Sequence, residues 1–401
     1  MIEAATTDYD VPSHVPPSLV MEWNHYDDSS LREDPIGCYD RLRSQHRIFY
    51  SPLFGGFWVL THYDDVRTVL QDAEVWSNVN SSIPKRPNRL LPLHLDPPEH
   101  TKYRKIINGP FTPARVRTLE DGIRSVTRSL LDMIEPGVDF DFVDAFAKPL
   151  PSAVFCTLFG LPSDDWRRFI SWNETILHVS DMQVREQATQ EIKALLREVI
   201  AERLSEPRDD LITEITGAEV DGQSLSDEEL LDFSFQLFMA GLDTVATALG
   251  FTFSHLGENK SDRDQIVADN DLIPDVVEEL LRLYSFVHLT RTATRDTTLA
   301  GVAIKKGELL LLPLASTGRD EEAYNRATQA DFSRRASRHL AFGAGPHRCV
   351  GSHLARLELQ IAVEEWHARF PEYTVLPPTG PVGHGGATLG LDHVWMRIHE
   401  G

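Results

Sequence analysis

The stretch from Phe342 to Gly351 reads FGAGPHRCVG, and an amphipathic helical segment, HLARLELQIAVEEW, follows it. Cys349 lies just before that helix, where the helix dipole and the neighbouring His347 and Arg348 favour a thiolate. Close approach of the backbone to a flat ligand is permitted by three glycines, Gly343, Gly345 and Gly351. A buried structural cysteine in a glycine-rich turn is the alternative. We expect the loop to press a thiolate against a large planar group.

The composition argues against several classes of protein. The 401 residues carry a formal charge of -22, from 39 basic and 61 acidic side chains. This charge disfavours binding to nucleic acid or to an anionic membrane surface. The N-terminus does not resemble a signal peptide, and no run of about 18 apolar residues occurs. We therefore expect an unprocessed, cytoplasmic protein.

Three cysteines occur, at positions 38, 156 and 349, without a CxxC pair. This usage predicts neither a disulfide framework nor a cysteine zinc site. Cys38 and Cys156 have apolar neighbours and are expected to be buried. The histidines lack HExxH spacing, which argues against a zinc hydrolase.

The hydrophobic periodicity predicts one mainly α domain with a smaller β region over residues 1–401, with residues 1–20 extended or poorly ordered. Asp96 is expected to cap a helix that ends at Gly109 and Pro110. Strands are expected beside a turn at 53–56, within 298–313 and at 394–398. Further helices are expected at 114–134, 163–177, 184–205, 227–257, 274–284 and 352–370.

Three more patterns carry polar chemistry on helices. Glu279 and Arg282 share one helix face, and alone they predict only a surface ion pair. His100 and Arg104 are four residues apart, which alone is typical of a solvated face. Asp243 and Thr244 follow Ala240-Gly241-Leu242 in an apolar helix that Ser226 and Glu229 begin as a capping box. A buried acid is costly unless it is paired or used, although a kinked core helix is the alternative.

The loop from Phe342 to Gly351 resembles the haem-binding signature of cytochromes P450. In that family the matching cysteine, here Cys349, is the proximal iron ligand. The resemblance implies that Phe342 packs beside the sulfur, that Gly343 and Gly351 contact haem, and that His347 binds a propionate. The implied fold is the cytochrome P450 fold, and the implied cofactor is haem b.

The other patterns match the family in the same order along the chain. Glu279 and Arg282 resemble its structural ExxR ion pair. Asp243 and Thr244 resemble its oxygen-activation pair, in which the acid relays protons and the hydroxyl stabilises iron-bound oxygen. His100, Arg104 and Arg291 resemble its propionate-binding positions. Ala240 and Gly241 would lie beside the haem in a locally distorted helix.

Several segments make the chain look like the camphor hydroxylase branch of soluble bacterial P450s. The implied substrate-pocket positions are Asn88, Gln236, Met239, Val287, Ala387 and Thr388. Most are apolar and of modest size, so we expect a compact, largely apolar substrate such as a terpenoid. Asn88 and Leu289 depart from the branch, which argues against camphor itself. His288 either enters the pocket or faces solvent.

The resemblance implies a monooxygenase that uses dioxygen and receives electrons from a ferredoxin and a ferredoxin reductase, as separate proteins. We expect a monomer with no nucleic-acid or membrane partner. A basic patch for an acidic ferredoxin is expected at Lys102, Lys105, Arg348 and Arg356. The alternatives are a steroid, fatty acid or aromatic substrate, and a non-catalytic haem sensor. A peroxygenase is disfavoured because Asp243 and Thr244 are both present.

Overall fold

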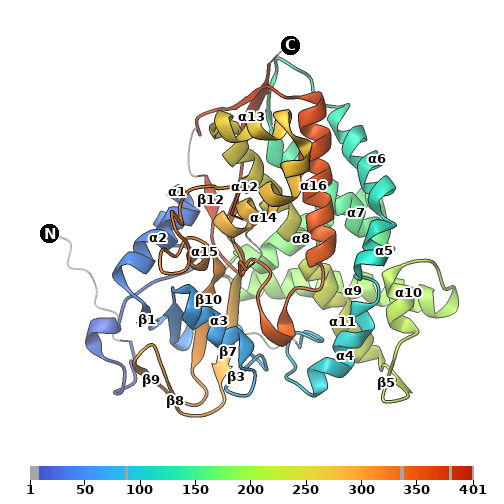
Figure 1. The fold of residues 1–401 in the computed structure, drawn as a ribbon. Helices are drawn as coiled ribbons and strands as arrows, with labels where there is room; N and C mark the ends of the chain where they lie inside the picture. Colours follow the sequence, from blue (N-terminus) through green and yellow to red (C-terminus); the bar gives the residue numbers. More distant parts are fainter. Residues whose placement is uncertain (1–8, 86–88, 335–337, 379–381, 400–401) are drawn as a thin grey trace.

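Helices make up most of the molecule, and a five-stranded sheet lies to one side of them (Figure 1). The computed structural model describes residues 9–85, 89–334, 338–378 and 382–399. The mainly α fold with a smaller β region is therefore confirmed. Of residues 1–20, which were expected to be extended or poorly ordered, the structure describes 9–20, where Val15 is buried and Val20 forms a bridge with Tyr50.

The helical elements are spread along the whole described chain. The longer helices are α2 (Pro35–Gln45), α3 (Tyr63–Gln71), α4 (Glu99–Asn108), α6 (Glu120–Leu131), α7 (Pro149–Phe159), α8 (Trp166–His178), α9 (Met182–Ser205), α11 (Asp227–Gly241), α12 (Thr244–Glu258), α13 (Lys260–Ala268), α14 (Ile273–Leu283) and α16 (Ser352–Arg369). The shorter ones are α1 (Ser29–Glu33), α5 (Pro113–Arg117), α10 (Leu211–Thr216) and α15 (Leu314–Thr317).

The main sheet has the strand order β1-β2-β10-β7-β3. Its strands are β1 (Ile48–Ser51), β2 (Phe57–Leu60), β10 (Leu309–Pro313), β7 (His288–Ala293) and β3 (Trp76–Ser77). The expected hairpin is confirmed, because β1 and β2 pair antiparallel from Ile48 with Leu60 to Ser51 with Phe57. Strand β10 runs parallel to β2 and antiparallel to β7.

Four smaller sheets complete the β region of the described chain. One joins β11 (Tyr373–Val375), β14 (Trp395–Ile398) and β4 (Asp139–Asp141). The others are two-stranded: β5 (Glu219–Val220) with β6 (Gln223–Ser224), β8 (Thr297–Leu299) with β9 (Val302–Ile304), and β12 (Gly383–His384) with β13 (Gly390–Leu391). The strands expected within 298–313 and at 394–398 are confirmed as β8, β9, β10 and β14.

Three helix predictions need correction. The helix expected at 114–134 is two, because Thr118 turns back through hydrogen bonds to Arg115 and ends α5. The helix expected at 227–257 is divided into α11 and α12 by Leu242 and Asp243. Asp96 does not cap α4, since its carboxylate accepts hydrogen bonds from Ser77 and Asn78 instead.

Helix α12 lies in the largest hydrophobic cluster and contacts α14 and α16. Phe253 of α12 packs on Trp366 of α16, and neither side chain is exposed. The described stretch Asp227–Glu258 is long and apolar enough to span a membrane, but 72% of its most apolar window is buried inside the protein. Such burial is typical of a core helix. The capping box of Ser226 and Glu229 is confirmed at its start.

Candidate active site

The loop before α16 folds as its glycines predict. Gly343 and Gly345 have φ angles of 68° and 69°, in the left-handed region that favours glycine. A side chain at position 345 would also clash with the carbonyl oxygen of Leu70. The Cys349 amide donates to the Phe342 carbonyl at 2.9 Å, which closes the loop. The guanidinium of Arg356 lies 4.4 Å from the centre of the Phe342 ring.

Cys349 differs from the other two cysteines in its surroundings. Cys38 and Cys156 are buried, as expected, whereas Cys349 is exposed. Burial among protein atoms nevertheless raises the pKa of its thiol, and this effect outweighs the opposing hydrogen bond from the Gly351 amide and the charge of Arg104. A side chain that lines an internal cavity has accessible surface and is also surrounded by protein atoms, and Cys349 shows both features. A coordinated metal would deprotonate such a thiol outright.

The helix expected at 227–257 is interrupted where the sequence places Asp243. Helix α11 ends at Gly241, and α12 begins at Thr244. A Cβ atom at Gly241 would lie 2.2 Å from the Phe155 ring, so close packing of α7 requires glycine here. The Thr244 hydroxyl donates to the Ala240 carbonyl at 3.3 Å. Ala240 is exposed although Met239 beside it is buried, so this part of the helix also faces open space.

Asp243 contacts residues that are distant in the sequence. Its Oδ2 accepts a hydrogen bond of 2.8 Å from the Thr388 hydroxyl, and its Oδ1 lies 3.5 Å from Nε2 of His178. Burial alone would raise the pKa of Asp243. The charges of His178 and His384, with the Thr388 hydrogen bond, lower that pKa to about 2. Asp243 is therefore an ionised carboxylate.

Four cationic or hydrogen-bond-donating side chains converge beside the Cys349 loop. The rings of His100 and His347 are 4.1 Å apart. Burial and the nearby charges of Arg104 and Arg291 lower the pKa of His100 to about 4 and that of His347 to about 2. His347 is therefore neutral, and the expectation that its positive charge favours the thiolate is wrong. The buried Nε2 atoms of both histidines have no hydrogen-bond partner among the described residues.

The two arginines of this group complete an anion-binding environment. Arg291 is buried, and burial lowers its pKa to about 10, although Asp96 partly offsets this. Arg104 donates to the Arg348 carbonyl and to the Asn108 side chain. Repulsion among so many donors is relieved by anionic groups that accept their hydrogen bonds. The four side chains therefore fit a ligand with carboxylates.

Glu279 and Arg282 are not a surface pair. Both side chains are almost completely buried, and they form two parallel hydrogen bonds of 2.7 and 2.8 Å. Arg334 also donates to Glu279, at 3.0 Å. Arg282 donates further to the carbonyls of Gly318, Ala327 and Gln329. The ion pair therefore connects α14 to the segment that leads to the Cys349 loop.

The predicted substrate-pocket residues have different positions. Asn88 lies outside the described residues. Met239 is buried, and within the described part of the chain the buried Oε1 atom of Gln236 has no hydrogen-bond partner. Val287 and Ala387 are partly exposed. Thr388 forms a bridge with Val287, and its hydroxyl donates to Asp243. His288 neither faces solvent nor is free, because Tyr39 and the Gly386 carbonyl hold it.

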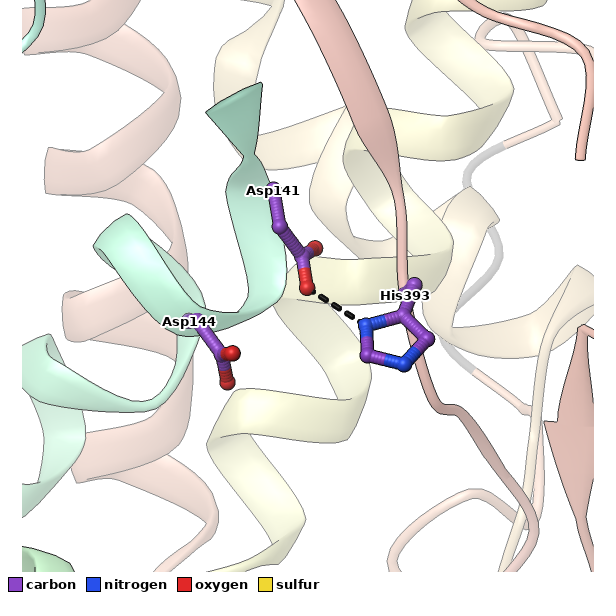
Figure 2. A group of neighbouring side chains, drawn as sticks. All are labelled: Asp141, Asp144 and His393. Atoms are coloured by element: carbon purple, nitrogen blue, oxygen red, sulfur yellow. Dashed lines mark hydrogen bonds and ion pairs between the residues drawn. The ribbon is translucent and has the colours of Figure 1, made fainter. Parts of the chain in front are cut away.

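One group among the described residues has the spacing of metal ligands, namely Asp141, Asp144 and His393 (Figure 2). Asp141 accepts hydrogen bonds from the Val143 and Val394 amides and contacts His393 at 2.6 Å. Through these contacts Asp141 holds the turn after β4 against the start of β14, which accounts for its position. The group therefore carries no metal assignment.

The comparisons with known proteins agree with this geometry. The sequence matches the family model described as Cytochrome P450 over residues 166–370. It is 33% identical over 397 residues to the probable cytochrome P450 127A1 of Sinorhizobium fredii, which covers 96% of each chain. The chain belongs to the cytochrome P450 family.

Two further relatives extend the comparison. The erythromycin C-12 hydroxylase of Saccharopolyspora erythraea is 37% identical over 333 residues, or 80% of this chain and 83% of that protein. The crystal structure of cytochrome P450 CYP101C1 aligns with a TM-score of 0.89 at 28% identity, over 97% of this chain and all of that one. The P450 fold, the monooxygenase class and the haem cofactor predicted from the sequence are confirmed.

The donors beside the Cys349 loop fit haem as the family implies. Haem carries two propionate carboxylates, and the unpartnered Nε2 atoms of His100 and His347 lie beside Arg104 and Arg291. Cys349 has open surface in its loop, and Ala240 has open surface at the end of a helical segment that is otherwise largely buried. These residues are suited to hold a planar group with two acidic arms.

Sequence reasoning missed two sets of contacts. His178 on α8 and His384 on β12 approach Asp243, and neither belongs to a recognisable pattern. Glu278, next to the predicted Glu279, holds both His339 and Arg356 and so fixes the start of α16. For the contacts to His339 and Arg356, the signal available in the sequence was the acidic residue Glu278 directly before Glu279.

Proposed function

We propose that this P450 hydroxylates a compact, largely apolar small molecule, with Cys349 as the thiolate ligand of the haem iron. The observation that carries the assignment is that Cys349 alone of the three cysteines is exposed, within a loop closed onto Phe342. When bound, haem supplies oxygen activation, which consumes dioxygen, two electrons and two protons and yields a hydroxylated product and water.

The chain's own residues have distinct roles in this proposal. His100, Arg104, Arg291 and His347 bind the propionates, while Phe342, Gly343, Gly351, Ala240 and Gly241 contact the ring. The Thr244 hydroxyl would support oxygen activation when haem is bound, and Asp243 would deliver protons for it. Packing against the Phe155 ring also excludes a side chain at Gly241.

The substrate proposal follows from the polarity of the pocket residues. Met239, Val287 and Ala387 are apolar, which favours a terpenoid-like skeleton. The Oε1 atom of Gln236 is buried and unpartnered, and it shares a helix face with Ala240. A substrate with one hydroxyl group would satisfy this acceptor. A macrolide is the competing candidate, because the name of the Saccharopolyspora relative gives erythromycin as its substrate.

A ligand screen distinguishes these substrates. Terpenoids, steroids, fatty acids, aromatics and macrolides are titrated into ferric protein, and the blue shift of the Soret band reports ligand binding. We expect compact terpenoid alcohols to give the largest shift, and Gln236→Leu to weaken the alcohol more than its parent hydrocarbon. A response to macrolides alone would contradict the compact pocket.

For the electron donor we propose an acidic ferredoxin, reduced by a separate ferredoxin reductase, that docks near the Cys349 loop. Of the four expected basic residues, Lys102 pairs with Asp221 and Arg356 pairs with Glu278. Lys105 and Arg348 are exposed, and no ion pair to either is seen among the described residues. Lys105→Glu should slow reduction by a ferredoxin more than Lys102→Glu does, and equal rates would contradict this docking site.

We further propose that residues 1–401 form a single P450 domain that acts as a cytoplasmic monomer. The relatives that span nearly the whole chain support the single domain. Light scattering coupled to size-exclusion chromatography tests the monomer, and a dimer mass would contradict it.

A further inference from the structure

Arg185 is an arginine in the first turn of α9, and only 2% of its surface is exposed. It lies on the buried face of that helix, together with Ala188, Thr189 and Ile192. Its Nη1 donates to the Tyr26 hydroxyl at 3.2 Å, whereas its buried Nη2 has no hydrogen-bond partner among the described residues. Since a guanidinium stays protonated in proteins, a positive charge lies where helix periodicity places apolar side chains.

The other buried arginines show what such a charge requires. In the described chain five arginines are buried, namely Arg185, Arg203, Arg263, Arg282 and Arg291. Three of them form ion pairs, which are Arg203 with Asp210, Arg263 with Glu372 and Arg282 with Glu279. Arg291 is assigned above to a haem propionate. Arg185 is thus the buried arginine to which the described residues and the cofactor supply no anion, and an uncompensated buried charge is costly.

The acids and histidines around Arg185 do not balance its charge. Asp181, at the start of α9, is exposed, and its carboxylate accepts hydrogen bonds from two backbone amides of that helix. Asp27, which follows Tyr26, is exposed and accepts a hydrogen bond from a neighbouring side chain. Burial lowers the pKa of His25 well below its ordinary value, so His25 is neutral. The guanidinium therefore keeps a net positive charge inside the protein.

A chain of contacts leads from Arg185 to the predicted substrate pocket. The ring of Tyr26, which Arg185 contacts, lies 4.5 Å from the ring of His25. The His25 carbonyl accepts a hydrogen bond of 2.8 Å from the Gly386 amide. The next residue, Ala387, is one of the predicted pocket residues and is partly exposed. Arg185 therefore lies on the side of the predicted pocket that Ala387 forms.

The chemistry of this position favours a carboxylate over other anions. One guanidinium balances one negative charge, whereas a phosphate dianion would need a second cation. The neighbouring His25 is neutral, and Tyr26 presents a hydroxyl. A carboxylate can accept two parallel hydrogen bonds from a guanidinium, which would satisfy the unpartnered Nη2. The apolar character of the predicted pocket then requires that the rest of the ligand be hydrocarbon-like.

We propose that Arg185 binds a carboxylate of the substrate, so that the compact, largely apolar molecule proposed above is an acid. The inference rests on the proposed monooxygenase function and narrows its substrate class. Gln236 and Arg185 recognise different groups, because the unpartnered Oε1 atom accepts a hydrogen bond and a guanidinium only donates. The ligand carboxylate supplies the counter-ion that Arg185 lacks and thereby orients the apolar skeleton.

The first experiment compares ligands that differ only in one polar group. Isothermal titration calorimetry of the ferric holoenzyme measures the affinities of cyclohexyl-substituted alkanoic acids with lengthening chains. Each acid is compared with the alcohol and the amine of the same skeleton. At the best chain length the acid should bind about 10- to 100-fold more tightly than the alcohol, and the amine most weakly. Acids that bind no more tightly than their alcohols at every chain length would overturn the inference.

The second experiment removes the charge. Arg185→Met should weaken binding of the acid by about 10- to 100-fold and change the affinity of the alcohol by no more than about twofold. Arg185→Lys, which keeps the charge without the paired donors, should lie between wild type and Arg185→Met. Arg197→Met, which replaces an exposed arginine of the same helix, is the matched control and should bind both ligands like wild type. Equal affinities of wild type and Arg185→Met for the acid would overturn the inference.

Thermal denaturation of the ligand-free holoenzyme separates binding from a structural role. Because Arg185 lacks a counter-ion without a ligand, Arg185→Met should raise the midpoint. Arg203→Met should lower it, since Asp210 would remain buried and unpaired. A lowered midpoint of Arg185→Met with unchanged acid affinity would assign the residue to the fold and overturn the inference. Loss of the thiolate-type carbon monoxide band in wild type would instead overturn the proposed function, and calorimetry does not depend on that band.

Discussion

Glu279 and Arg282 form a buried bidentate ion pair, with side-chain exposures of 1% and 0%. The pair is surrounded by Arg334, three backbone carbonyls and the ring of Tyr324. Because every hydrogen-bonding atom has a partner here, loss of one charge would leave the other buried and uncompensated.

Glu279→Gln should therefore lower the free energy of unfolding by about 3–5 kcal/mol, the range for breaking a buried ion pair. Chemical denaturation of the holoenzyme measures the change. The matched control is Asp264→Asn, which removes the exposed partner of Lys260 and should have no measurable effect. Equal stability of Glu279→Gln and wild type would contradict a structural role for the pair.

Arg291→Gln should weaken haem retention. Hydrogen bonds to charged groups contribute about 1.5–3 kcal/mol, which corresponds to roughly 10- to 100-fold in affinity. Haem transfer to apomyoglobin measures the loss. Arg295→Gln, an exposed arginine in the same segment, should retain haem like wild type. If both variants lose haem at the wild-type rate, Arg291 does not bind a propionate.

Thr244→Ala should preserve haem content and ligand-induced Soret shifts but divert electrons into hydrogen peroxide. The reason is that the variant loses the hydroxyl proposed to support oxygen activation while the helix break remains. Thr252→Ala, further along α12, serves as the control. A haem sensor would show no change in peroxide yield, so an unchanged yield would favour that alternative.

Glu358 should cause the free energy of unfolding to decrease as pH rises. It is buried on α16 with one unpartnered oxygen, and burial raises its pKa to about 8. Between the unfolded pKa near 4.5 and the folded pKa near 8, the unfolded chain loses a proton that the folded protein keeps. The free energy of unfolding should therefore fall as pH rises, by at most about 1.4 kcal/mol per pH unit.

Denaturation of wild type, Glu358→Gln and the exposed control Glu321→Gln from pH 5 to pH 8 tests this dependence. The slope of Glu358→Gln should be shallower than that of the other two proteins. Parallel slopes for all three would show that Glu358 is ionised in the folded protein.

Local patterns predicted the parts of the site that depend on neighbouring residues. The left-handed glycines around Cys349 and the i, i+3 spacing of Glu279 and Arg282 are both encoded within a few positions. Long-range contacts were not predictable. The partners of Asp243, His178 and Thr388, are brought to it by separate elements, so no sequence spacing reveals them.

Burial also changed the chemistry that the sequence suggested. His347 was expected to add positive charge, but desolvation and the surrounding cations keep it neutral. Helix periodicity predicted one continuous helix over 227–257, because it does not register the packing of Phe155 against Gly241 or the side contacts of Asp243. Tertiary packing decides such features, and a single sequence does not specify it locally.

The carbon monoxide difference spectrum of dithionite-reduced protein tests the central claim, that sulfur from Cys349 binds the haem iron. Wild type should show the long-wavelength Soret band of thiolate-ligated haem, and so should Cys156→Ser, whose residue is buried elsewhere. Cys349→Ser should lose that band. A wild-type spectrum without it, or an unchanged band in Cys349→Ser, would contradict the assignment.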